Sequence, residues 1–525
     1  MGGFGHGLRS GALLAVAAVV AAGLPAAGLP AAAEAPDRPE FLHVGPAAGP
    51  TGLPQVLDES GRTVLLRGVN VNGLVDYWTS NLVPPYPVDP RAYAGGACPA
   101  DSTVTTAVPL CERDLAQIAA LGWDVVRLPV SWSLLEPLPG RVDPLYLERI
   151  AQVVGWARQR GVRVVVDLHQ DAWSKFVFAP KGTVCPPGST AMDGGDGAPV
   201  WASVHVTPAC APGGTRELEP PVQEAAQRFW SDLPAPDGVG LQEHYAAVVT
   251  ALAQRFAVEP AVAGYELMNE PQPGFAPGVM DGTELMRFHG KVVDAVVAAV
   301  PHLRQLFFVE PAGTRNVTGA RTFAAPWSTY SRYPHVVYAP HVYTGVFTAD
   351  STVLQGKAGT LQSSDGDYQA AVGDAKALGL PLWIGEFGND PRDDRRLLDP
   401  HYAHQDSLGI GGALWVWKEH GTWGVLTPPY DGGGRSVGTR TTRVATAYPA
   451  ATVGVLDSFT SDPFRGTAAF RAHAPASRLP AVVVLPAAFR GPLRVTGAAY
   501  RVRRRAGVRE VLLFPRGGAY ALDVR

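Results

Sequence analysis

The sequence predicts a (β/α)8 TIM barrel followed by a small C-terminal antiparallel β-sandwich. Eight apolar stretches of strand length alternate with mostly helical stretches over about 360 residues, and parallel strands need such crossover helices. Most of these stretches end in polar side chains, which is where a TIM barrel carries its chemistry. Beyond about residue 440, helical periodicity gives way to short β-type runs separated by Pro and Gly.

The first 33 residues are expected to form a cleaved secretory signal peptide. A weakly basic start with Arg9 precedes the apolar run GALLAVAAVVAAGL and the segment PAAGLPAAAEA, which offers Ala-x-Ala cleavage sites. The apolar core of about 14 residues is too short to span a bilayer comfortably. No cysteine lies at the expected cleavage point near Ala33, which argues against a lipoprotein. We therefore expect a secreted, extracellular protein.

The barrel is expected to occupy residues 40–440. A hairpin that turns at Glu59–Gly61 leads into the first strand, Leu66–Val71. Helical stretches at Pro144–Arg160 and Pro221–Phe256 alternate with later strands. Those strands are expected at Asp124–Val130, Val162–Asp171, Val262–Glu270, Gln305–Pro311, His335–Tyr343, Leu380–Gly388 and Gly411–Glu419. A doubly wound open sheet is the alternative, but no G-x-G-x-x-G or P-loop motif follows the first strand.

The chain has four cysteines, Cys98, Cys111, Cys185 and Cys210. An even number in an exported protein indicates two disulfides, for which three connectivities exist. Proximity favours Cys98–Cys111 and Cys185–Cys210, each of which closes a Pro/Gly-rich loop. A zinc site is the competing interpretation, although no C-x-x-C or H-E-x-x-H spacing occurs.

Polar residues at the strand ends form a candidate active-site ring. Any one of them could be an ordinary cap or turn residue, but together they favour a shared catalytic or binding site at the barrel mouth. In chain order the strand ends offer Asn70, Asn72, Arg127, His169, Asp171, Asn269, Glu270, Glu310, His341, Tyr343, Glu386, Trp417 and Lys418.

Residues 441–525 are expected to form the β-sandwich domain. Its β-type runs are AAFRAH, AVVVLP, LRVTGAAYRV and EVLLFP. Structural packing on the barrel is the expected role, and binding to carbohydrate or a membrane is the alternative. The basic run Arg501–Arg505 is interpreted as a solvated strand face. A formal net charge of -3 gives no electrostatic reason to expect a nucleic-acid partner.

Glu270 and Glu386 end the fourth and seventh strands, so their side chains should face each other across the barrel mouth. Such a pair suits cleavage of a glycosidic bond, in which one carboxyl group protonates the leaving oxygen and the other attacks the anomeric carbon. Arg127 and Tyr343 are expected to hold Glu386 ionised. The charge of Glu386 should raise the pKa of Glu270 once substrate excludes water. Asn269 is expected to contact the sugar 2-hydroxyl.

Six motifs on the strands resemble those of the clan A retaining glycosidases of glycoside hydrolase family 5. They are RLPVSW, DLHQD, ELMNEP, APHVY, IGEFG and LWVWK, and the resemblance covers roughly Gln55 to Glu419. It implies that Glu270 is the acid/base and Glu386 the nucleophile. It also implies that neither a metal nor a cofactor is needed, and that the supporting residues are Arg127, His169, Asn269, His341, Tyr343 and Trp417.

The run DLHQDAWS and the C-terminal β-sandwich look most like those of endoglycoceramidases and their glycosylceramidase relatives. This likeness implies cleavage of the β-linkage between a glycan and ceramide, with Asp167 mostly structural and Asp171 in contact with the sugar. The expected partners are a glycolipid or oligosaccharide substrate and, transiently, a lipid surface or micelle, with the protein a monomer. The strand-one exit NVNGLVDYW and the insertion 172–220 match no family segment and would shape substrate choice.

A glycolipid substrate also predicts two unlike halves of the cleft, because unpaired polar groups are expensive to bury. The lipid side should be apolar, and the loops after strands one, three, four and six supply DYW, WSKFVF, PGFAPGVM and GVF. Trp173, Phe176 and Phe275 are candidates for lipid contact. The sugar side should be lined by Arg127, His169, Asp171, Asn269 and Trp417.

Three other functions compete with this interpretation. A family 5 β-glucanase or β-mannanase would use the same carboxyl pair on soluble oligosaccharides. A non-catalytic carbohydrate-binding barrel would not need that pair. A metal-dependent hydrolase lacks the usual H-x-H or carbamylated-lysine signature here and would use His169, Asp171, His341 and Glu310. If the enzyme is a glycosidase, Glu310 is interpreted as a secondary glycan contact or a loop anchor.

Overall fold

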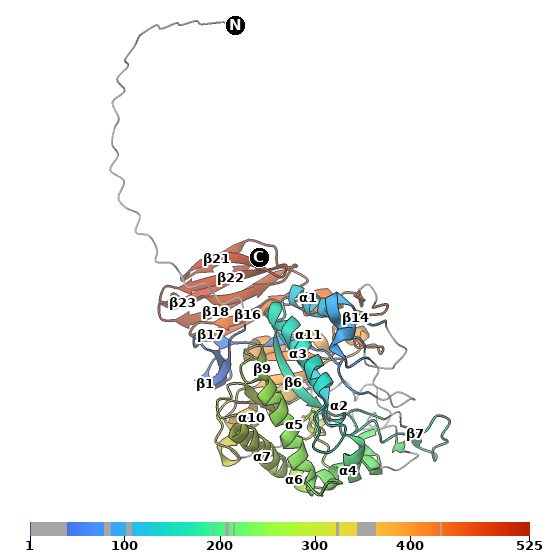
Figure 1. The fold of residues 1–525 in the computed structure, drawn as a ribbon. Helices are drawn as coiled ribbons and strands as arrows, with labels where there is room; N and C mark the ends of the chain where they lie inside the picture. The colour runs from blue at the N-terminus through green and yellow to red at the C-terminus, as the bar shows by residue number, and fades with distance from the viewer. Residues whose placement is uncertain are drawn as a thin grey trace, which may run out of the picture.

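The computed structural model describes residues 39–77, 86–100, 108–192, 194–204, 209–213, 216–321, 325–343, 364–430 and 433–525, besides Met1. The predicted signal peptide therefore lies outside the described residues, except for Met1. Figure 1 shows a helix-covered barrel with a β-rich unit, coloured red, at one end. Within the described ranges, no helix is both long and apolar enough to cross a membrane.

An eight-stranded parallel sheet forms the barrel. Its strands are β4 (Arg67–Asn70), β5 (Val125–Ser131), β6 (Arg163–His169), β9 (Val262–Glu266), β10 (Leu306–Val309), β11 (Val336–Tyr338), β12 (Trp383–Phe387) and β13 (Gly411–Leu414). They pair in the order β11-β10-β9-β6-β5-β4-β13-β12. Parallel bridges Tyr338–Leu382 and Val342–Phe387 link the β11 segment to the β12 segment and close the ring. The predicted TIM barrel is confirmed.

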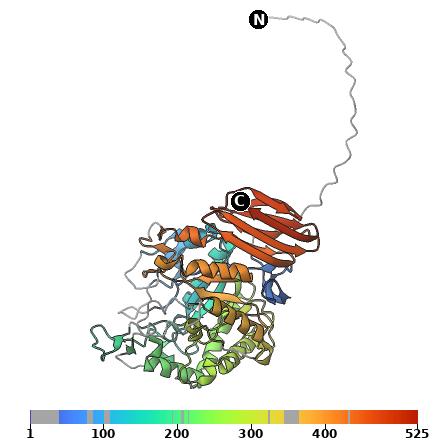
Figure 2. The same ribbon diagram turned by 180° about the vertical axis from the view of Figure 1, so that it is seen from behind.

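Helices cover the outside of this sheet (Figures 1 and 2). The first turn of α3 contains Pro144, and Asp143 caps it by accepting a hydrogen bond from the Tyr146 N–H. The helical stretch predicted from Pro221 to Phe256 is two helices, because prolines and glycines interrupt it between residues 234 and 240. The main helices are α1 (Glu112–Ala120), α3 (Pro144–Gln159), α4 (Pro220–Trp230), α5 (Leu241–Phe256), α7 (Thr283–Ala299), α10 (Ser364–Leu378) and α11 (Leu398–Leu408).

Two disulfides hold the loops near the barrel. The insertion after β6 contains β7 (Ser189–Ala191) and β8 (Cys210–Pro212), which pair antiparallel, and Cys185 is bonded to Cys210. The other disulfide joins Cys98 to Cys111, the N-cap residue of α1. Both disulfides expected from the sequence are present, so no cysteine is left for a zinc site.

Two antiparallel sheets form the C-terminal β-sandwich. One contains β17 (Val455–Asp462), β18 (Thr467–Ala474), β23 (Gly518–Val524) and β20 (Leu493–Thr496). The other contains β16 (Tyr448–Thr452), β19 (Ala481–Leu485), β22 (Val508–Pro515) and β21 (Ala498–Arg505), and it is extended by β1 (Leu42–Ala48), β2 (Leu53–Asp58) and β3 (Thr63–Val64). The N-terminal hairpin thus joins a sheet of the sandwich. The domain limits of 40–440 and 441–525 stay a prediction.

The sandwich packs on the end of the barrel at which the strands begin. The Tyr448 hydroxyl donates a hydrogen bond of 2.8 Å to the carbonyl oxygen of Gly122, just before β5. The buried guanidinium of Arg67, at the start of β4, pairs with Asp406 at 2.7 Å and donates to Thr446 at 3.0 Å. The carboxyl ends of the strands are where a barrel active site is expected, and they therefore face away from the sandwich.

Candidate active site

Arg127 lies at the centre of the polar ring predicted from the sequence. Its side chain is carried by β5 and is fully buried. A buried charge needs charged or hydrogen-bonding partners to offset its loss of hydration. The partners of Arg127 come from the ends of β4, β6, β9, β10 and β12, so the guanidinium links these strand ends into one network. The guanidinium donates to Glu386 (2.5 Å), Glu266 (2.6 Å), Asn269 (2.8 Å) and Asn70 (3.0 Å), and it pairs with Asp167 (3.1 Å) and Glu310 (3.4 Å).

Glu386 lies on β12 with its carboxylate almost fully buried. Arg127 donates to its Oε1 at 2.5 Å, and the Tyr343 hydroxyl donates to its Oε2 at 2.7 Å. Burial raises the pKa of Glu386, while the charge of Arg127 opposes that rise. The two donors favour the ionised form, which a nucleophile requires.

Glu270 follows β9 and lies beside His341, whose Nδ1 is 2.8 Å from Glu270 Oε1. Its backbone has a φ of 40°, in the left-handed region that residues other than glycine rarely occupy. Burial, together with the charge of Asp171, raises the pKa of Glu270 to about 7. This carboxyl group can therefore hold a proton at neutral or mildly acidic pH, as a general acid must.

The two carboxyl groups are close together. One oxygen of Glu270, one oxygen of Glu386 and a ring nitrogen of His341 all lie within 4.8 Å of one another. Retaining glycosidases hold their carboxyl pair about 5–5.5 Å apart, whereas inverting enzymes leave about 6.5–9.5 Å for a water molecule. The spacing in this protein fits direct attack by a carboxylate on the sugar.

His169 ends β6 and is paired with Asp167, whose Oδ2 lies 2.7 Å from His169 Nδ1. Burial alone would lower the pKa of His169, but the charge and hydrogen bond of Asp167 outweigh it and raise the pKa to about 9. Because Asp167 also lies 3.1 Å from Arg127 Nη2, it orients two cationic side chains at once. This geometry supports the structural role expected for Asp167.

Asp171 lies at the rim, where the insertion folds back onto the barrel. Both of its carboxylate oxygens accept hydrogen bonds from Arg216 Nη2, at 2.6 Å and 2.7 Å. Sequence analysis did not identify Arg216, because it lies 45 residues further along the chain, within a segment that has no recognisable motif. A contact between Asp171 and the sugar stays a prediction.

Comparison with known proteins assigns this site to a family. The model for Cellulase (glycosyl hydrolase family 5) matches residues 108–421. The chain belongs to glycosyl hydrolase family 5. It is therefore an O-glycosyl hydrolase. This family 5 enzyme is 28% identical to endoglycoceramidase I of Rhodococcus hoagii, over 79% of its own chain and 75% of that protein.

Two other comparisons extend this result. A glucosylceramidase of Rhizopus delemar is 28% identical over 42% of this chain and 35% of that protein. The crystal structure of an endogalactoceramidase is similar with a TM-score of 0.74 and 30% identity, covering 93% of this chain and 100% of that one. Endo-glycoceramidase II from Rhodococcus sp., in a complex with ganglioside GM3, shares the fold with a TM-score of 0.70 at 24% identity, over 89% of this chain and 98% of that one.

In this family 5 enzyme Trp415, which was not among the predicted site residues, lies against His169. The half-buried Trp415 ring stacks on His169, with centroids 5.7 Å apart and an interplanar angle of 10°. Trp417 is only 2% exposed, and its indole N–H donates to Asp114 at 3.1 Å. A contact between Trp417 and the sugar stays a prediction. Sequence analysis missed Trp415 because β13 ends at Leu414, after which strand alternation no longer applies.

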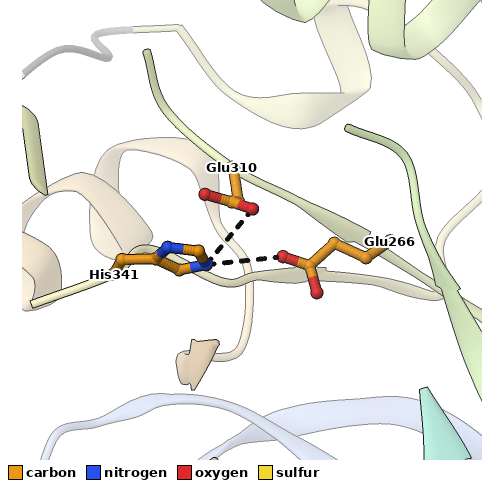
Figure 3. A group of neighbouring side chains, drawn as sticks. All are labelled: Glu266, Glu310 and His341. Carbon is orange, nitrogen blue, oxygen red and sulfur yellow. Dashed lines mark ion pairs between the residues drawn. The ribbon is translucent and has the colours of Figure 1, made fainter. Parts of the chain in front are cut away.

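Glu310 is fully buried and points at the His341 ring (Figure 3), so a glycan contact is wrong for it. The alternative, a loop anchor, fits the hydrogen bond that Glu310 accepts from the Glu270 backbone N–H. The metal-hydrolase alternative required His169, Asp171, His341 and Glu310 to gather, but His169 pairs with Asp167 and Asp171 with Arg216. Among the described residues, two His/carboxylate groups are compact enough for a metal, namely His341 with Glu266 and Glu310, and His341 with Glu270 and Glu386. Arg127 already supplies a cation to both groups, which opposes a second one.

The expected apolar exit is only partly formed by the predicted residues. Phe275, five positions after Glu270, is 69% exposed, and Phe176 is half-buried. Trp173 is buried instead, because its indole N–H donates to the Ala202 carbonyl oxygen at 3.1 Å and its ring packs on Phe229. It cannot line the exit. Trp78 of DYW and the segment GVF at residues 345–347 lie outside the described residues.

Proposed function

We propose that this enzyme is a retaining β-glycosidase that cleaves the bond between the glycan and the ceramide of glycosphingolipids. The observation that carries the retaining mechanism is the presence of Glu270 and Glu386 oxygens within 4.8 Å of each other. Support for the substrate comes from the endoglycoceramidase, glucosylceramidase and endogalactoceramidase relatives. The exposed Phe275, on the loop that follows Glu270, and the exposed Met280, at the end of the short helix α6 (Pro277–Met280), supply apolar surface for a lipid aglycone.

In the first half-reaction, Glu386 attacks the anomeric carbon while Glu270 gives its proton to the glycosidic oxygen. Ceramide leaves as an alcohol, and the glycan stays ester-linked to Glu386. Arg127 and Tyr343 hold the attacking carboxylate in place. Asn269 uses one amide hydrogen on the Gln170 carbonyl oxygen, at 2.8 Å, and has a second one for the sugar 2-hydroxyl.

In the second half-reaction, the ionised Glu270 takes a proton from water as the water oxygen attacks the anomeric carbon. The bond to Glu386 breaks, and the glycan is released with its original anomeric configuration. Glu270 is protonated again and Glu386 is again a carboxylate, so both groups are restored after one turnover.

We further propose that the enzyme is exported and acts as a monomer that contacts lipid surfaces or micelles transiently. The signal-like sequence of residues 1–33 supports export. Two disulfides also support it, because such bonds persist mainly in oxidising compartments.

Substrate choice is tested with the purified enzyme on glycosylceramides in detergent micelles, aryl β-glycosides and soluble β-glucans and β-mannans. We expect intact glycan and ceramide to be released faster than any soluble polysaccharide is cut at equal sugar concentration. Faster cleavage of a β-glucan or β-mannan would instead make the enzyme a general β-glycanase of the family.

The two carboxyl roles are tested by chemical rescue. Glu386→Ala should abolish turnover and be rescued by azide with inversion at the anomeric carbon, because a small anion can replace a missing nucleophile. Glu270→Ala should still cleave substrates with good leaving groups and then accumulate the glycosyl-enzyme. Azide rescue of Glu270→Ala to an inverted product would exchange the two roles.

A further inference from the structure

Glu310 is a buried carboxyl group that the proposed mechanism leaves unused. It follows β10 and has no exposed surface. Its Oε1 is 3.2 Å from His341 Nε2, a buried nitrogen that makes no hydrogen bond within the described residues, and its Oε2 accepts a hydrogen bond of 3.3 Å from the Glu270 backbone N–H. Figure 3 shows the Glu310 and Glu266 side chains pointing at the same ring nitrogen of His341. Glu310 therefore contacts the acid/base through its backbone and through His341.

His341 stands between two carboxyl groups and is neutral. Its Nδ1 lies 2.8 Å from Glu270 Oε1, on the side opposite Glu310. Burial lowers the pKa of His341 to about 4, so near neutral pH the ring carries one N–H rather than two. A neutral imidazole can donate to one of these neighbours and must accept from the other. The tautomer thus decides whether Glu270 faces a proton donor or a lone pair.

We propose that Glu310 is a positioning residue that fixes the tautomer of His341, with Nε2–H donating to Glu310 and Nδ1 accepting the carboxylic proton of Glu270. The proposal rests on the proposed function, because it takes Glu270 to be the general acid. With this tautomer the ring stabilises protonated Glu270 and places a lone pair against its ionised form. With the other tautomer, Nδ1–H would stabilise the carboxylate and weaken the acid.

The surroundings of Glu310 suit it to accept the His341 proton. Burial and the charge of Glu266 raise the pKa of Glu310 well above its usual value, and Glu310 is hydrogen-bonded to Glu266. When the proton of Glu310 is directed to Glu266, the other oxygen remains an acceptor for Nε2–H. Glu310 then adds no further negative charge beside the catalytic pair.

Other charged groups also face the acid/base and must stay constant in a test. Asp171 raises the pKa of Glu270, whereas His169 and Arg127 lower it. Glu386, across the mouth, and Glu217, from the insertion, also interact with Glu270. Around His341, the charges of Glu386, Arg127, Glu266 and His169 act on its pKa. Substitution of Glu310 leaves each of these side chains in the protein.

The test compares Glu310→Gln with Glu310→Leu. Gln keeps an oxygen acceptor for His341 and can direct its amide N–H to Glu266, so we expect the alkaline limb of kcat/KM to stay near its wild-type pH. Leu removes the acceptor, so His341 can also adopt the tautomer that carries its hydrogen on Nδ1. We then expect the alkaline limb to move to lower pH, with about a tenfold or greater loss on aryl glycosides that have poor leaving groups and little loss on activated ones.

A merely structural role for Glu310 would lower activity on both classes of aryl glycoside equally and leave the alkaline limb in place, which would overturn the proposal. The ¹⁵N shifts of the His341 ring in the wild-type enzyme provide a test that needs no variant. Protonated Nε2 with bare Nδ1 supports the proposal, and the reverse overturns it. If the activity of Glu270→Ala did not depend on the leaving group, the acid role itself would fail, whatever the variants of Glu310 show.

A second observation concerns the β-sandwich and is independent of the active site. A pocket of about 420 Å³ lies at one end of the sandwich, beside the turn between β21 and β22. Of the residues that the structure describes, three arginines and no acidic side chain line it. The lining residues are Leu485, Pro486, Ala487, Phe489, Arg490, Arg504, Gly507 and Arg509.

The arginines are arranged with their charges uncompensated. Arg504 and Arg509 are directly opposite each other in the β21–β22 register, where like charges destabilise a sheet. Among the described residues, Arg509 donates only to the backbone carbonyl oxygens of Phe489 and Gly491, and its buried Nε has no hydrogen-bond partner there. Arg490 donates to the Ala487 carbonyl oxygen. Within the described part of the chain, none of the three arginines has a carboxylate partner.

We infer that this pocket binds a phosphate- or sulfate-type anion. Planar guanidinium groups bind such oxyanions with paired hydrogen bonds, and a bound anion would remove the repulsion between Arg504 and Arg509. The buried Nε of Arg509 would gain an acceptor at the same time. The anion could be free in solution or part of a lipid headgroup, and the two sources are separated by experiment.

The test measures thermal stability and titration heats with inorganic phosphate for the wild type, Arg504→Gln and Arg494→Gln. Arg494 is an exposed arginine on β20 outside the pocket and serves as the matched control. We expect phosphate to raise the Tm of the wild type and of Arg494→Gln. Arg504→Gln should have a higher Tm without phosphate and gain little from it. An equal response of all three proteins, or no response, would overturn the inference.

Vesicles identify the source of the anion. Sedimentation with phosphatidylcholine vesicles that contain phosphatidic acid, but not with pure phosphatidylcholine, would assign the pocket to a phosphomonoester headgroup, provided that Arg504→Gln loses the binding. Heats with inorganic phosphate and no vesicle binding would assign it to a free anion. Neither signal in the wild type would overturn the inference.

Discussion

Glu270 and Glu386 have different surroundings, and this difference assigns their roles. Glu386 accepts hydrogen bonds from two donors, one of them the Arg127 guanidinium. Among the described residues, Glu270 has no such cation in contact and lies instead beside the neutral ring of His341. A carboxyl group without a contacting cation, near another carboxylate, keeps its proton more readily. The two groups are therefore driven toward opposite protonation states by their contacts.

The pKa of Glu270 predicts the pH dependence of the reaction. Because the group must be protonated in the first step and its pKa is about 7, kcat/KM on a soluble aryl glycoside should fall as the pH rises above about 7. Asp171→Asn removes a negative charge that raises this pKa, so the alkaline limb should move to lower pH. A limb that stayed in place, or moved upward, would mean that Asp171 does not act on Glu270 through charge.

The two tryptophans after β13 give a second test at the residue scale. Trp415→Ala should remove the ring that stacks on His169 and raise KM by up to about tenfold with little change in Tm, because an aromatic stacking contact contributes roughly 0.5–1.5 kcal/mol. Trp417→Phe should lower Tm, because it leaves the Asp114 oxygen without its indole donor, and should leave KM near the wild-type value. The reverse result would restore Trp417 as the sugar-binding residue.

At the scale of elements, the sequence predicted the strands better than the segments that follow them. Apolar stretches bounded by polar residues identified all eight barrel strands, so residues on or next to the strands, such as Arg127 and Glu386, reached their expected positions. The positions of residues beyond the paired ends of the strands, such as Trp415 and Trp417, depend on loop geometry that no local periodicity encodes. Arg216 depends on a long insertion and was missed for the same reason.

The loop after β9 tests the proposed lipid exit. Phe275→Ser, which removes an exposed apolar ring close to Glu270, should raise KM for a glycosylceramide in micelles several-fold and leave a soluble aryl glycoside unaffected. Phe176→Ser should act in the same direction. Val258→Ser is the matched control, because Val258 is also exposed but precedes β9, at the opposite end of the barrel. Unchanged kinetics on the glycolipid would remove this loop from the aglycone site.

At the scale of the whole molecule, the main feature hidden from the sequence is the sheet shared by the two ends of the chain. β3 pairs with β16, so Val64 lies opposite Ala451 across almost four hundred residues of sequence. The sequence of each strand is typical of an ordinary short β segment, and only packing determines which strand it pairs with. Leu65, next to β3, belongs to the hydrophobic core of the sandwich rather than to that of the barrel.

This shared sheet predicts that the barrel does not fold alone. A chain truncated after residue 440 loses β16, and with it the pairing partner of β3, the Thr446 acceptor of the buried Arg67 and the hydroxyl that binds the Gly122 carbonyl oxygen. It also exposes Leu65. We expect this truncated chain to aggregate or to melt about 10 °C or more below the full-length protein, because several buried groups lose their partners together.

A milder change separates the role of this seam, the contact between the barrel and the sandwich, from that of the active site. Tyr448→Phe removes one buried hydrogen bond to Gly122 and should cost about 1–3 kcal/mol of stability. It should leave kcat and KM unchanged at temperatures where the protein is folded, because the seam lies at the opposite end of the strands from Glu270 and Glu386. If the chain truncated after residue 440 kept the full-length Tm and activity, the sandwich would be an independent appendage, and the limit at residue 440 would mark a true domain boundary.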